Sequence, residues 1–340
     1  MACGSNPVLK VTVKQRFLRW FRYARRFAGS FWLTNWNALR GASYIPHPRT
    51  RLCIETVSFC NLECKFCSYP KKLHPRTVMD DALFQRSVDQ AVTLGYRRLA
   101  LTPINGDVFM DKKFVERLQY IENSSIEIIE FYTNFIGADE AAIASLLSLK
   151  KVSLMEISVY GHDADSFQSV TRRGTKQFDR LVDNLNALER LWSHRNPGMK
   201  IVISLRTYRS FRFGDPHGNE LLEVIERLRG LGAVIGLSSS VDNWGGAIDE
   251  DDIADIDMEL TDGRYLYKKG PCRLPFDTVQ ITADGRVNAC ACRDPGGELT
   301  LGDIHDAPLS DILSVDNAKW SKIVSDHETG NYNDVCASCG

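Results

Sequence analysis

The first groups in this sequence that could do chemistry are three cysteines within a stretch of eight residues. Cys60, Cys64 and Cys67 follow a C-x3-C-x2-C spacing. The apolar run over 52–58 predicts a buried strand, so the cysteines come at its C-terminal end, where barrel-like α/β folds keep their reactive groups. A closed structural zinc site and a ferredoxin cluster each need four ligands. Three thiolates therefore suit a 4Fe–4S cluster with one iron left open.

A second group of four cysteines lies near the end of the chain: Cys272, Cys290, Cys336 and Cys339. Residues 278–281 and 286–289 predict two short strands, and the Asp284-Gly285 pair between them is a strong hairpin signal. Such a hairpin brings the first two cysteines toward one another, and the last two form a C-x2-C pair. Four thiolates can hold one further metal centre, which is either a cluster or a zinc ion. Cys292 is an alternative ligand or an idle buried thiol.

The composition is that of an ordinary globular protein. The chain has 340 residues, of which 44% are hydrophobic and 25% are charged, enough for one large α/β domain and a smaller one. A net charge of −1 gives no overall field that would attract nucleic acid. The ten cysteines are clustered, which favours metal ligation in a reducing compartment over a secreted disulfide scaffold. We therefore expect a cytoplasmic protein with no nucleic-acid partner and no membrane-spanning helix.

The N-terminal segment differs from the rest in charge. Residues 1–54 contain ten Lys and Arg and no Asp or Glu, and residues 14–32 place aromatic side chains on one helical face and arginines on the other. This pattern fits a helix in contact with an anionic membrane surface, which would make the protein membrane-peripheral. It also fits a helix packed on the main domain, or a transit peptide. The sequence leaves these three interpretations open.

From residue 51 onward, strand-like and helical runs alternate. The strand-like runs are 51–58, 97–102, 126–133, 152–159, 200–206 and 233–239, and the helical runs are 80–94, 111–121, 138–148, 176–193 and 218–231. Alternation of this kind predicts parallel strands joined by right-handed crossovers, with six units where a closed barrel has eight. The following segment, 247–265, is acidic and has no basic residue before Arg264, which predicts a solvated linker. Further helical pieces are expected at 308–314 and 316–326.

The C-x3-C-x2-C spacing, with Phe66 before its last cysteine, resembles the signature of the radical S-adenosylmethionine (SAM) superfamily. In that family the open iron of the cluster binds the amino and carboxylate groups of SAM. The resemblance implies an α/β fold, a partial (β/α)6 TIM-like barrel, with SAM-binding groups where its strands end. The C-terminal cysteines resemble the twitch form of the SPASM extension, which implies a small cysteine-rich domain of β-hairpin plus helix. That domain would hold one auxiliary 4Fe–4S cluster on the four cysteines.

Several residues after the predicted strands would then contact SAM. Asn105-Gly106-Asp107 stands where the family usually has Gly-Gly-Glu, so Asp107 keeps the charge on a shorter arm; a plain turn is the alternative. Ser158 is placed to bond the SAM ribose or carboxylate. Arg206 is placed to pair with a carboxylate, unless it is a surface arginine. The loop over 241–246 would cover the mouth, contacting SAM or substrate, or would only turn the chain.

The resemblance also implies a domain layout. It consists of a basic aromatic helical extension (1–50), the radical SAM barrel (51–246), an acidic linker (247–270) and the auxiliary-cluster domain (271–340). The implied activity is reductive cleavage of SAM, with electrons from a donor such as flavodoxin or ferredoxin, followed by hydrogen abstraction from a substrate. A single auxiliary cluster resembles the family's dehydrogenases of cyclitol- and sugar-like alcohols, so we expect a small polar substrate and a net oxidation.

Two other functions remain open. One is a maturase that modifies a peptide or protein, although residues 1–50 are short and aromatic for the leader-binding domain that such relatives often carry. The other is a binding module in which zinc holds both cysteine groups. The histidines give no acid–base pair, because His74, His162, His217 and His305 are dispersed. No catalytic acid or base is assigned.

Overall fold

A nine-stranded sheet organises the computed structural model, which describes residues 50–71, 75–214, 217–261, 272 and 274–339, together with Ala24 and Ala28. The strand order is β11-β10-β9-β1-β2-β3-β4-β5-β6. Six neighbouring strands are parallel: β1 (Arg51–Ile54), β2 (Arg98–Leu101), β3 (Ile128–Thr133), β4 (Val152–Tyr160), β5 (Lys200–Arg206) and β6 (Val234–Ser238). The predicted run of six parallel strands is therefore confirmed.

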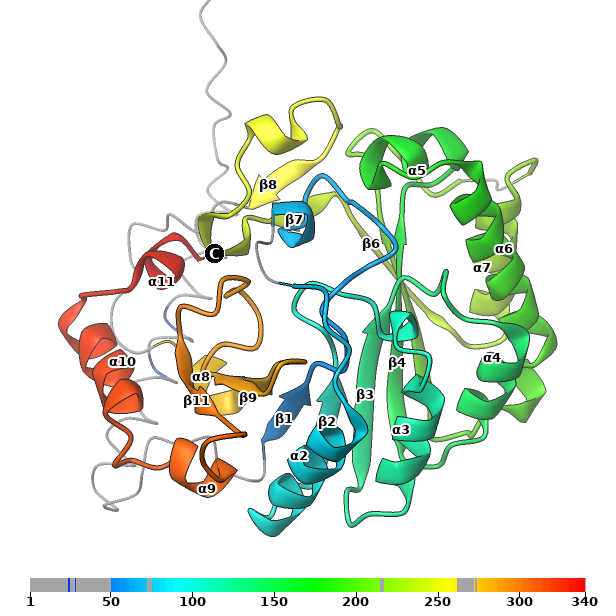
Figure 1. Ribbon diagram of the computed structural model, residues 1–340. Helices are drawn as coiled ribbons and strands as arrows, with labels where there is room; N and C mark the ends of the chain where they lie inside the picture. Colours follow the sequence, from blue (N-terminus) through cyan, green and yellow to red (C-terminus); the bar gives the residue numbers. More distant parts are fainter. Residues whose placement is uncertain are drawn as a thin grey trace, which may run out of the picture.

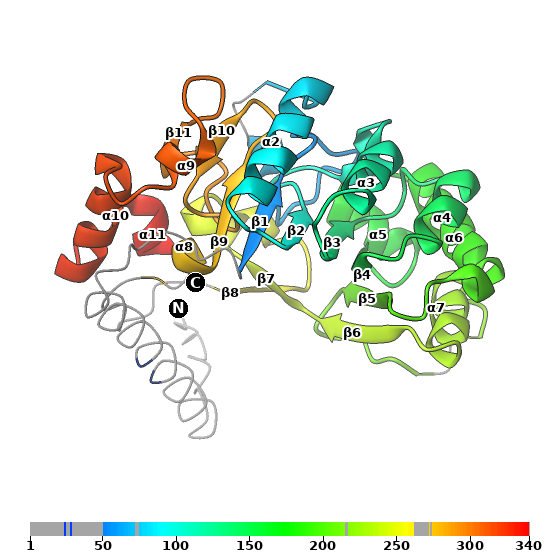
Figure 2. The same cartoon turned by 90° about the horizontal axis from the view of Figure 1, so that it is seen from below.

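Helices connect these strands and lie on the convex side of the curved sheet (Figures 1 and 2). The connecting helices are α2 (Asp81–Thr93), α3 (Phe114–Glu122), α4 (Glu140–Leu147), α5 (Ala164–Thr171), α6 (Thr175–Arg190) and α7 (Glu220–Gly230). The sheet has β6 at one edge and β11 at the other, so it does not close on itself. It is a partial barrel, as expected, with α5 as an extra short helix before the predicted long one.

Local sequence explains where several of these helices begin. The side chains of Asp80, Asp139 and Asp163 accept hydrogen bonds from backbone N–H groups in the first turns of α2, α4 and α5. Asp163 forms a capping box with Ser166, which stabilises α5 despite its eight residues. Along α6, apolar side chains at helical spacing such as Leu181, Leu185 and Leu188 are buried against the sheet.

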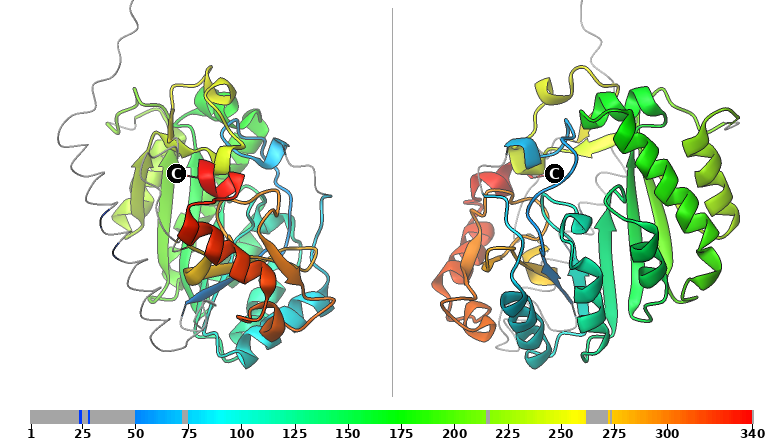
Figure 3. Two further views of the ribbon diagram at one scale, coloured as in Figure 1. Left: turned by 90° about the vertical axis from the view of Figure 1, so that its left-hand side faces the viewer. Right: turned by 45° about the vertical axis from the view of Figure 1, so that its right-hand side comes forward.

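The C-terminal region extends the same sheet. Strand β9 (Thr278–Ile281) pairs in parallel with β1 and forms the predicted hairpin with β10 (Arg286–Asn288), which in turn pairs with β11 (Thr300–Asp303). The helices of this region are α8 (Leu274–Asp277), α9 (Leu309–Ile312), α10 (Ala318–Thr329) and α11 (Asp334–Ser338). Helix α10 packs beside β11, in the red and orange part of Figure 3. The cysteine-rich region is thus joined to the barrel through backbone pairing.

The acidic segment is not a solvated linker in its described part, 247–261. Four apolar side chains of this segment are buried: Ile248, Ile253, Ile256 and Met258. Its strand β8 (Glu259–Thr261) pairs with β7 (Ser240–Asp242), and the short helix η5 (Asp251–Ile253) lies between them in the chain. These apolar side chains explain the docking, because burying them removes apolar surface from water. Residues 262–270 lie outside the described part.

The predicted N-terminal helix, 14–32, also lies outside the described residues, except for Ala24 and Ala28, which are both helical. Its predicted contact with a membrane surface therefore stays a prediction. Within the residues that the structure describes, no helix combines the length and the apolar character of a membrane span.

Candidate active site

The cysteine loop, residues 60–67, follows β1 and is fixed by backbone hydrogen bonds to the end of α5. The N–H groups of Glu63 and Lys65 donate to the carbonyls of Thr171 (3.1 Å) and Val170 (3.0 Å). Arg173 adds a second anchor, because its Nε donates to the Asn61 carbonyl (3.0 Å) and its guanidinium pairs with Glu63 (2.7 Å). These contacts with α5 and Arg173 therefore position the loop.

Cys60, Cys64 and Cys67 lie near one another, since Cys67 influences the pKa of Cys60 and both influence the pKa of Cys64. Burial raises the pKa of all three thiols, that of Cys67 to about 11, and the proximity of the other two cysteines raises the pKa of Cys64 further. Backbone N–H groups donate to two of the sulfurs: Leu62 to Cys60 and Tyr69 to Cys67, both at 3.4 Å. Such donors stabilise thiolates and tune the potential of a bound cluster.

The turn Asn105-Gly106-Asp107 lies against the start of the cysteine loop. A Cβ on Gly106 would meet the carbonyl oxygens of Val57 at 2.7 Å and Phe59 at 2.9 Å, so only glycine allows this approach. The amide of Asn105 is buried; its Oδ1 accepts from the Ser68 hydroxyl (2.5 Å), while its Nδ2 has no partner in the described part of the chain. An unpaired buried donor beside three thiols fits an acceptor supplied by a bound molecule such as SAM.

Asp107 is buried and already bonded within the protein. Its carboxylate accepts from the N–H of Asn134 (2.6 Å), the N–H of Phe109 (3.0 Å) and the Thr133 hydroxyl (2.9 Å). Burial raises the pKa of Asp107, and these hydrogen bonds oppose that rise. The carboxylate thus joins the end of β3 to η2 (Val108–Met110), and its predicted contact with the SAM amino group stays a prediction.

Arg206 and Ser158 meet around a residue that the sequence did not single out, Tyr160. Burial raises the pKa of Tyr160, while Arg206 and Ser158 oppose that rise, and the Arg206 guanidinium lies 6.0 Å from the Tyr160 ring centroid. The same ring packs on Phe66 with 5.1 Å between centroids. Arg206 also lowers the pKa of Cys64 and Cys67, although burial dominates both. The sequence could have pointed to Tyr160, because it ends β4 two residues after Ser158, which was predicted to contact SAM.

Asn134 is a further residue that contacts the cysteine loop. Its Nδ2 donates to the Asn61 side chain at 2.6 Å and lies 3.5 Å from the Cys60 sulfur. Asn134 directly follows Thr133, the last residue of β3. Tertiary structure decides this contact, because β3 and the loop after β1 are separated by β2.

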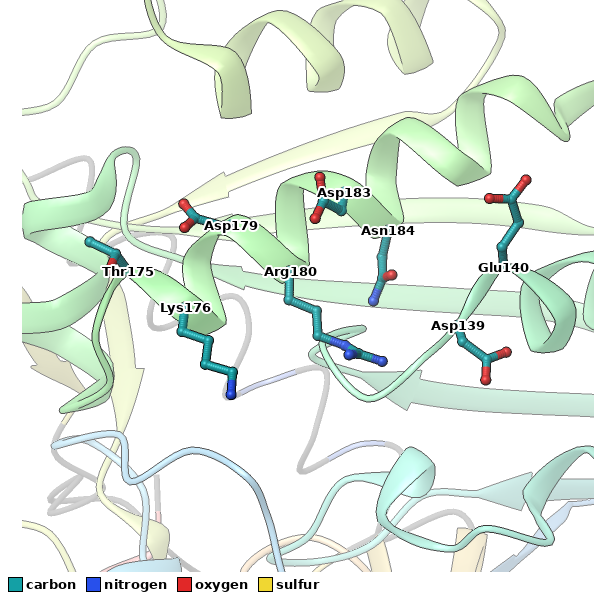
Figure 4. Close-up of a pocket in the computed structure, with 8 residues that line it drawn as sticks. All are labelled: Asp139, Glu140, Thr175, Lys176, Asp179, Arg180, Asp183 and Asn184. Carbon is teal, nitrogen blue, oxygen red and sulfur yellow. The ribbon is translucent and has the colours of Figure 1, made fainter.

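A polar pocket between α4 and α6 explains how the loop after β3 is held (Figure 4). Asn184 on its floor donates to the carbonyls of Phe135 (2.7 Å) and Ala138 (2.8 Å), and Arg180 Nε donates to the Ile136 carbonyl (3.1 Å). Figure 4 shows both side chains reaching from α6 toward the beginning of α4. These hydrogen bonds therefore hold the segment that follows Asn134 in place. Asn134 itself contacts the cysteine loop.

The fold brings three cysteines of the C-terminal region close together, Cys272, Cys290 and Cys292. Burial raises the pKa of Cys290, and Cys292 and Cys272 raise it further through their proximity. The N–H of Cys272 donates to His327 Nδ1 (3.3 Å). Cys336 is buried within α11 and Cys339 ends this helix, whereas the sequence had predicted no helix here. Cys53 is buried in β1.

No three His, Cys, Asp or Glu side chains of the described residues converge on a point where one metal ion could sit. A mononuclear site requires such convergence, with Zn–S distances of about 2.3 Å. In an iron–sulfur cluster each thiolate binds a different iron, so the thiols of one set need only surround a cluster. The two cysteine sets provide three and four thiols, and thiolates are the ligands that hold iron–sulfur clusters.

Models of two known protein families match this chain. The radical SAM superfamily model matches residues 54–204, and the model of an iron–sulfur cluster-binding domain, SPASM, matches residues 272–340. The chain is a radical SAM enzyme with a SPASM domain. Its cofactors are accordingly 4Fe–4S clusters and SAM, and it requires a reductant and a substrate. The comparison with curated proteins found no match for this radical SAM enzyme.

Three solved structures illustrate the fold of this radical SAM enzyme. BtrN in complex with AdoMet and 2-DOIA is 17% identical, with a TM-score of 0.54 over 86% of this chain and 93% of BtrN. SuiB from Streptococcus suis bound to the precursor peptide SuiA is 14% identical, with a TM-score of 0.59 over 96% of this chain and 75% of SuiB. The enzyme anSMEcpe with bound AdoMet is 14% identical, with a TM-score of 0.53 over 85% and 89%.

Proposed function

We propose that this radical SAM enzyme oxidises a small polar substrate, such as a cyclitol- or sugar-like alcohol, by two electrons. The substrate carbon loses a hydrogen atom to the radical derived from SAM. An auxiliary cluster held by the C-terminal cysteines would accept the second electron and solvent would take the proton, so that an alcohol carbon would become a carbonyl. When bound, SAM and its cluster supply the hydrogen-abstracting radical, a reaction that no side chain could perform.

The observation that carries this proposal is the presence of two separate cysteine sets attached to one sheet. We assign Cys60, Cys64 and Cys67 to the cluster that binds SAM. The auxiliary cluster is assigned to Cys272, Cys290, Cys336 and Cys339. A second cluster near the first gives the substrate radical a place to release an electron, which is what a net oxidation needs. The backbone pairing of β9 with β1 fixes the two regions relative to each other.

Side chains after β4 and β5 suit a polar molecule. Here a pocket is lined by His162, Asp163, Asp165, Ser166, Ser169, Tyr208, Ser210 and Phe211. His162 stacks on Phe211 with 4.5 Å between ring centroids, and its Nδ1 lies 2.7 Å from the Thr207 hydroxyl. Hydroxyl and carboxylate groups beside an aromatic ring can bind a hydroxylated substrate by hydrogen bonds and by stacking on its apolar face.

Isotope transfer tests the proposal. The reconstituted enzyme is supplied with SAM, a reductant and a panel of cyclitols and sugar alcohols deuterated at each carbinol carbon. We expect deuterium in 5′-deoxyadenosine and a ketone product from one member. The Cys336→Ala variant should still cleave SAM but form no ketone, while the Cys53→Ser control should form both. A ketone without deuterium transfer would exclude direct abstraction from that carbon.

The SuiB match supports one alternative, a peptide-modifying enzyme. SuiB is bound to a precursor peptide, and its structure aligns with 96% of this chain. BtrN, by contrast, is covered over 93% of its own length, which favours the small-substrate proposal. The same isotope assay with peptides deuterated at side-chain carbons separates the two. Transfer of deuterium from a peptide and from no small alcohol would replace the first proposal by the second.

A further inference from the structure

The short helix η4 (Trp244–Gly246) lies between the cysteine loop and the C-terminal cysteine set. On one side, a Cβ on Gly245 would stand 2.7 Å from the carbonyl oxygen of Arg293 and 3.2 Å from Val335, so the backbone here passes directly against both segments. Val335 precedes Cys336, and Arg293 follows Cys292. The preceding residue, Asn243, donates its Nδ2 to the Ser338 carbonyl (2.7 Å), next to Cys339. Thus η4 is packed on the backbone that carries the auxiliary cysteines.

On its other side, η4 is bonded to the cysteine loop through one side chain. The indole Nε1–H of Trp244 donates to the carbonyl oxygen of Phe66 at 2.9 Å. Phe66 directly precedes Cys67. The Trp244 ring is partly buried and also lies 5.7 Å from the guanidinium of Arg293. Trp244 therefore contacts the backbone beside Cys67 and the side chain of Arg293, while its neighbours Asn243 and Gly245 contact the backbone beside Cys339 and Cys336.

Asp242 and Arg293 fix the orientation of this tryptophan. The Asp242 carboxylate accepts from the Trp244 backbone N–H (2.8 Å) and pairs with Arg293 Nε (2.7 Å). Asp242, Trp244 and Arg293 thus form a small closed group, in which a charge-assisted pair holds the cation over the indole ring.

The backbone of Trp244 is strained. Its φ is +51°, a left-handed conformation that bulky residues rarely adopt. Such a conformation costs of the order of 1–3 kcal/mol and persists where the surroundings enforce it, commonly at functional sites. A glycine or asparagine would relieve the strain, so the large aromatic side chain at this position calls for a reason of its own.

We infer that Trp244 is a positioning residue that fixes the cysteine loop relative to the C-terminal cysteine set, and so fixes the distance and orientation between the two clusters. The inference rests on the proposed ligand assignment. Rates of electron transfer and hydrogen abstraction depend on such placement, and a displacement of about 1 Å can lower a catalysed rate about 100-fold. The loop between β6 and the SPASM region thereby acts as a spacer with a defined length.

The test compares Trp244→Phe with wild type and with Trp192→Phe. Phenylalanine keeps an aromatic ring but lacks the N–H donor. The control residue, Trp192, is also partly buried but stacks on Arg195 (4.9 Å) in the helix η3 (Trp192–His194). Each protein is reconstituted and reduced, and pulsed EPR measures the magnetic interaction between the two reduced clusters. Iron content is measured on the same samples.

We expect Trp244→Phe to bind as much iron as wild type while the interaction between its clusters becomes weaker and more broadly distributed. Trp192→Phe should match wild type in both measurements. If Trp244→Phe fails to fold, Asp242→Asn, which weakens the same group of contacts, is measured in its place. An unchanged interaction in a variant with both clusters bound overturns the positioning role alone. A wild-type protein with one cluster overturns the ligand assignment, and the positioning role with it.

Discussion

At the scale of single residues, Asp107 has a structural task that can be separated from SAM binding. Its buried carboxylate accepts three hydrogen bonds that join η2 to the end of β3. In Asp107→Asn the charge is lost, and the new NH2 group faces at least one of the N–H or O–H groups that donate to the carboxylate in the wild type. We expect a loss of about 2 kcal/mol in the free energy of unfolding, the size of a hydrogen bond to a charged group. Denaturant unfolding of the apo-protein measures it.

An exposed aspartate gives the matched control for this change. Asp89 accepts one hydrogen bond, from the Tyr120 hydroxyl at 2.9 Å, and Asp89→Asn should alter the stability by less than about 0.5 kcal/mol. If Asp107 serves only to bind the SAM amino group, Asp107→Asn will keep its stability and lose SAM affinity alone.

Gly245 is a second case at the residue scale, because its position leaves no room for a side chain. Its φ is +65°, and a Cβ would overlap the Arg293 carbonyl. Gly245→Ala should therefore lower the free energy of unfolding by at least about 1–2 kcal/mol through backbone strain alone. In Gly230→Ala, where nothing lies within 4 Å, alanine should be neutral or stabilising, because it is a better helix former. Equal thermal stability of the two variants would contradict the packing of η4.

At the scale of elements, the acidic segment 247–261 is held over the cysteine loop by ion pairs. Lys65 pairs with Asp255 at 2.5 Å, Lys71 pairs with Asp252, and Arg209 pairs with Asp257 at 2.8 Å. The Lys65 ammonium lowers the pKa of Asp255, and the pKa of Asp252 is also lowered, by its bond to Lys71 against the opposing effect of burial. These attractions are present above the ordinary carboxylate pKa of about 4 and are lost as the pH falls below it.

Removing these cations should loosen the segment without unfolding the protein. Pairs that are partly exposed contribute at most about 1 kcal/mol each. We therefore expect Lys65→Gln/Lys71→Gln to raise the rate of backbone hydrogen exchange within 247–261 and to leave exchange in α6 unchanged. The control, Lys113→Gln, breaks an exposed pair with Asp81 far from this segment. Unchanged exchange in the double variant would mean that the buried isoleucines alone hold the segment.

At the scale of the whole molecule, metal content distinguishes the cluster assignment from a structural zinc site. We expect about eight irons per chain after anaerobic reconstitution, corresponding to two 4Fe–4S clusters. Cys60→Ala and Cys336→Ala should each leave about four, because each removes a ligand from a different set. About four irons with one zinc would assign zinc to the C-terminal set.

Cys292 requires its own measurement, since it lies beside Cys290 without an assigned role. If the four assigned cysteines hold the second cluster, Cys292→Ser should bind about eight irons with an unchanged EPR spectrum. A loss of about four irons would instead place Cys292 among the ligands, in exchange for one of the other four.

The sequence by itself determined the elements of this protein and the chemistry of its cysteines. Helix caps such as Asp80 and Asp139, the alternation of strands and helices, and the C-x3-C-x2-C spacing are all local, so they can be read within a few residues. The six parallel strands and the β9–β10 hairpin followed from these signals. The three N-terminal cysteines were expected at one site for the same reason.

Only the tertiary structure decided how the two cysteine sets are joined. The pairing of β9 with β1 adds the C-terminal hairpin to the barrel sheet, and no local pattern specifies which distant edge strand a hairpin will choose. The acidic segment looked solvated because its charges outnumber its isoleucines, yet those few apolar residues found a surface to bury. Trp244 belongs to the loop 241–246, which the sequence predicted either to cover the mouth of the barrel or only to turn the chain. Its contacts with Phe66 and Arg293 could not be predicted, because such contacts arise only when segments far apart in the chain are packed together.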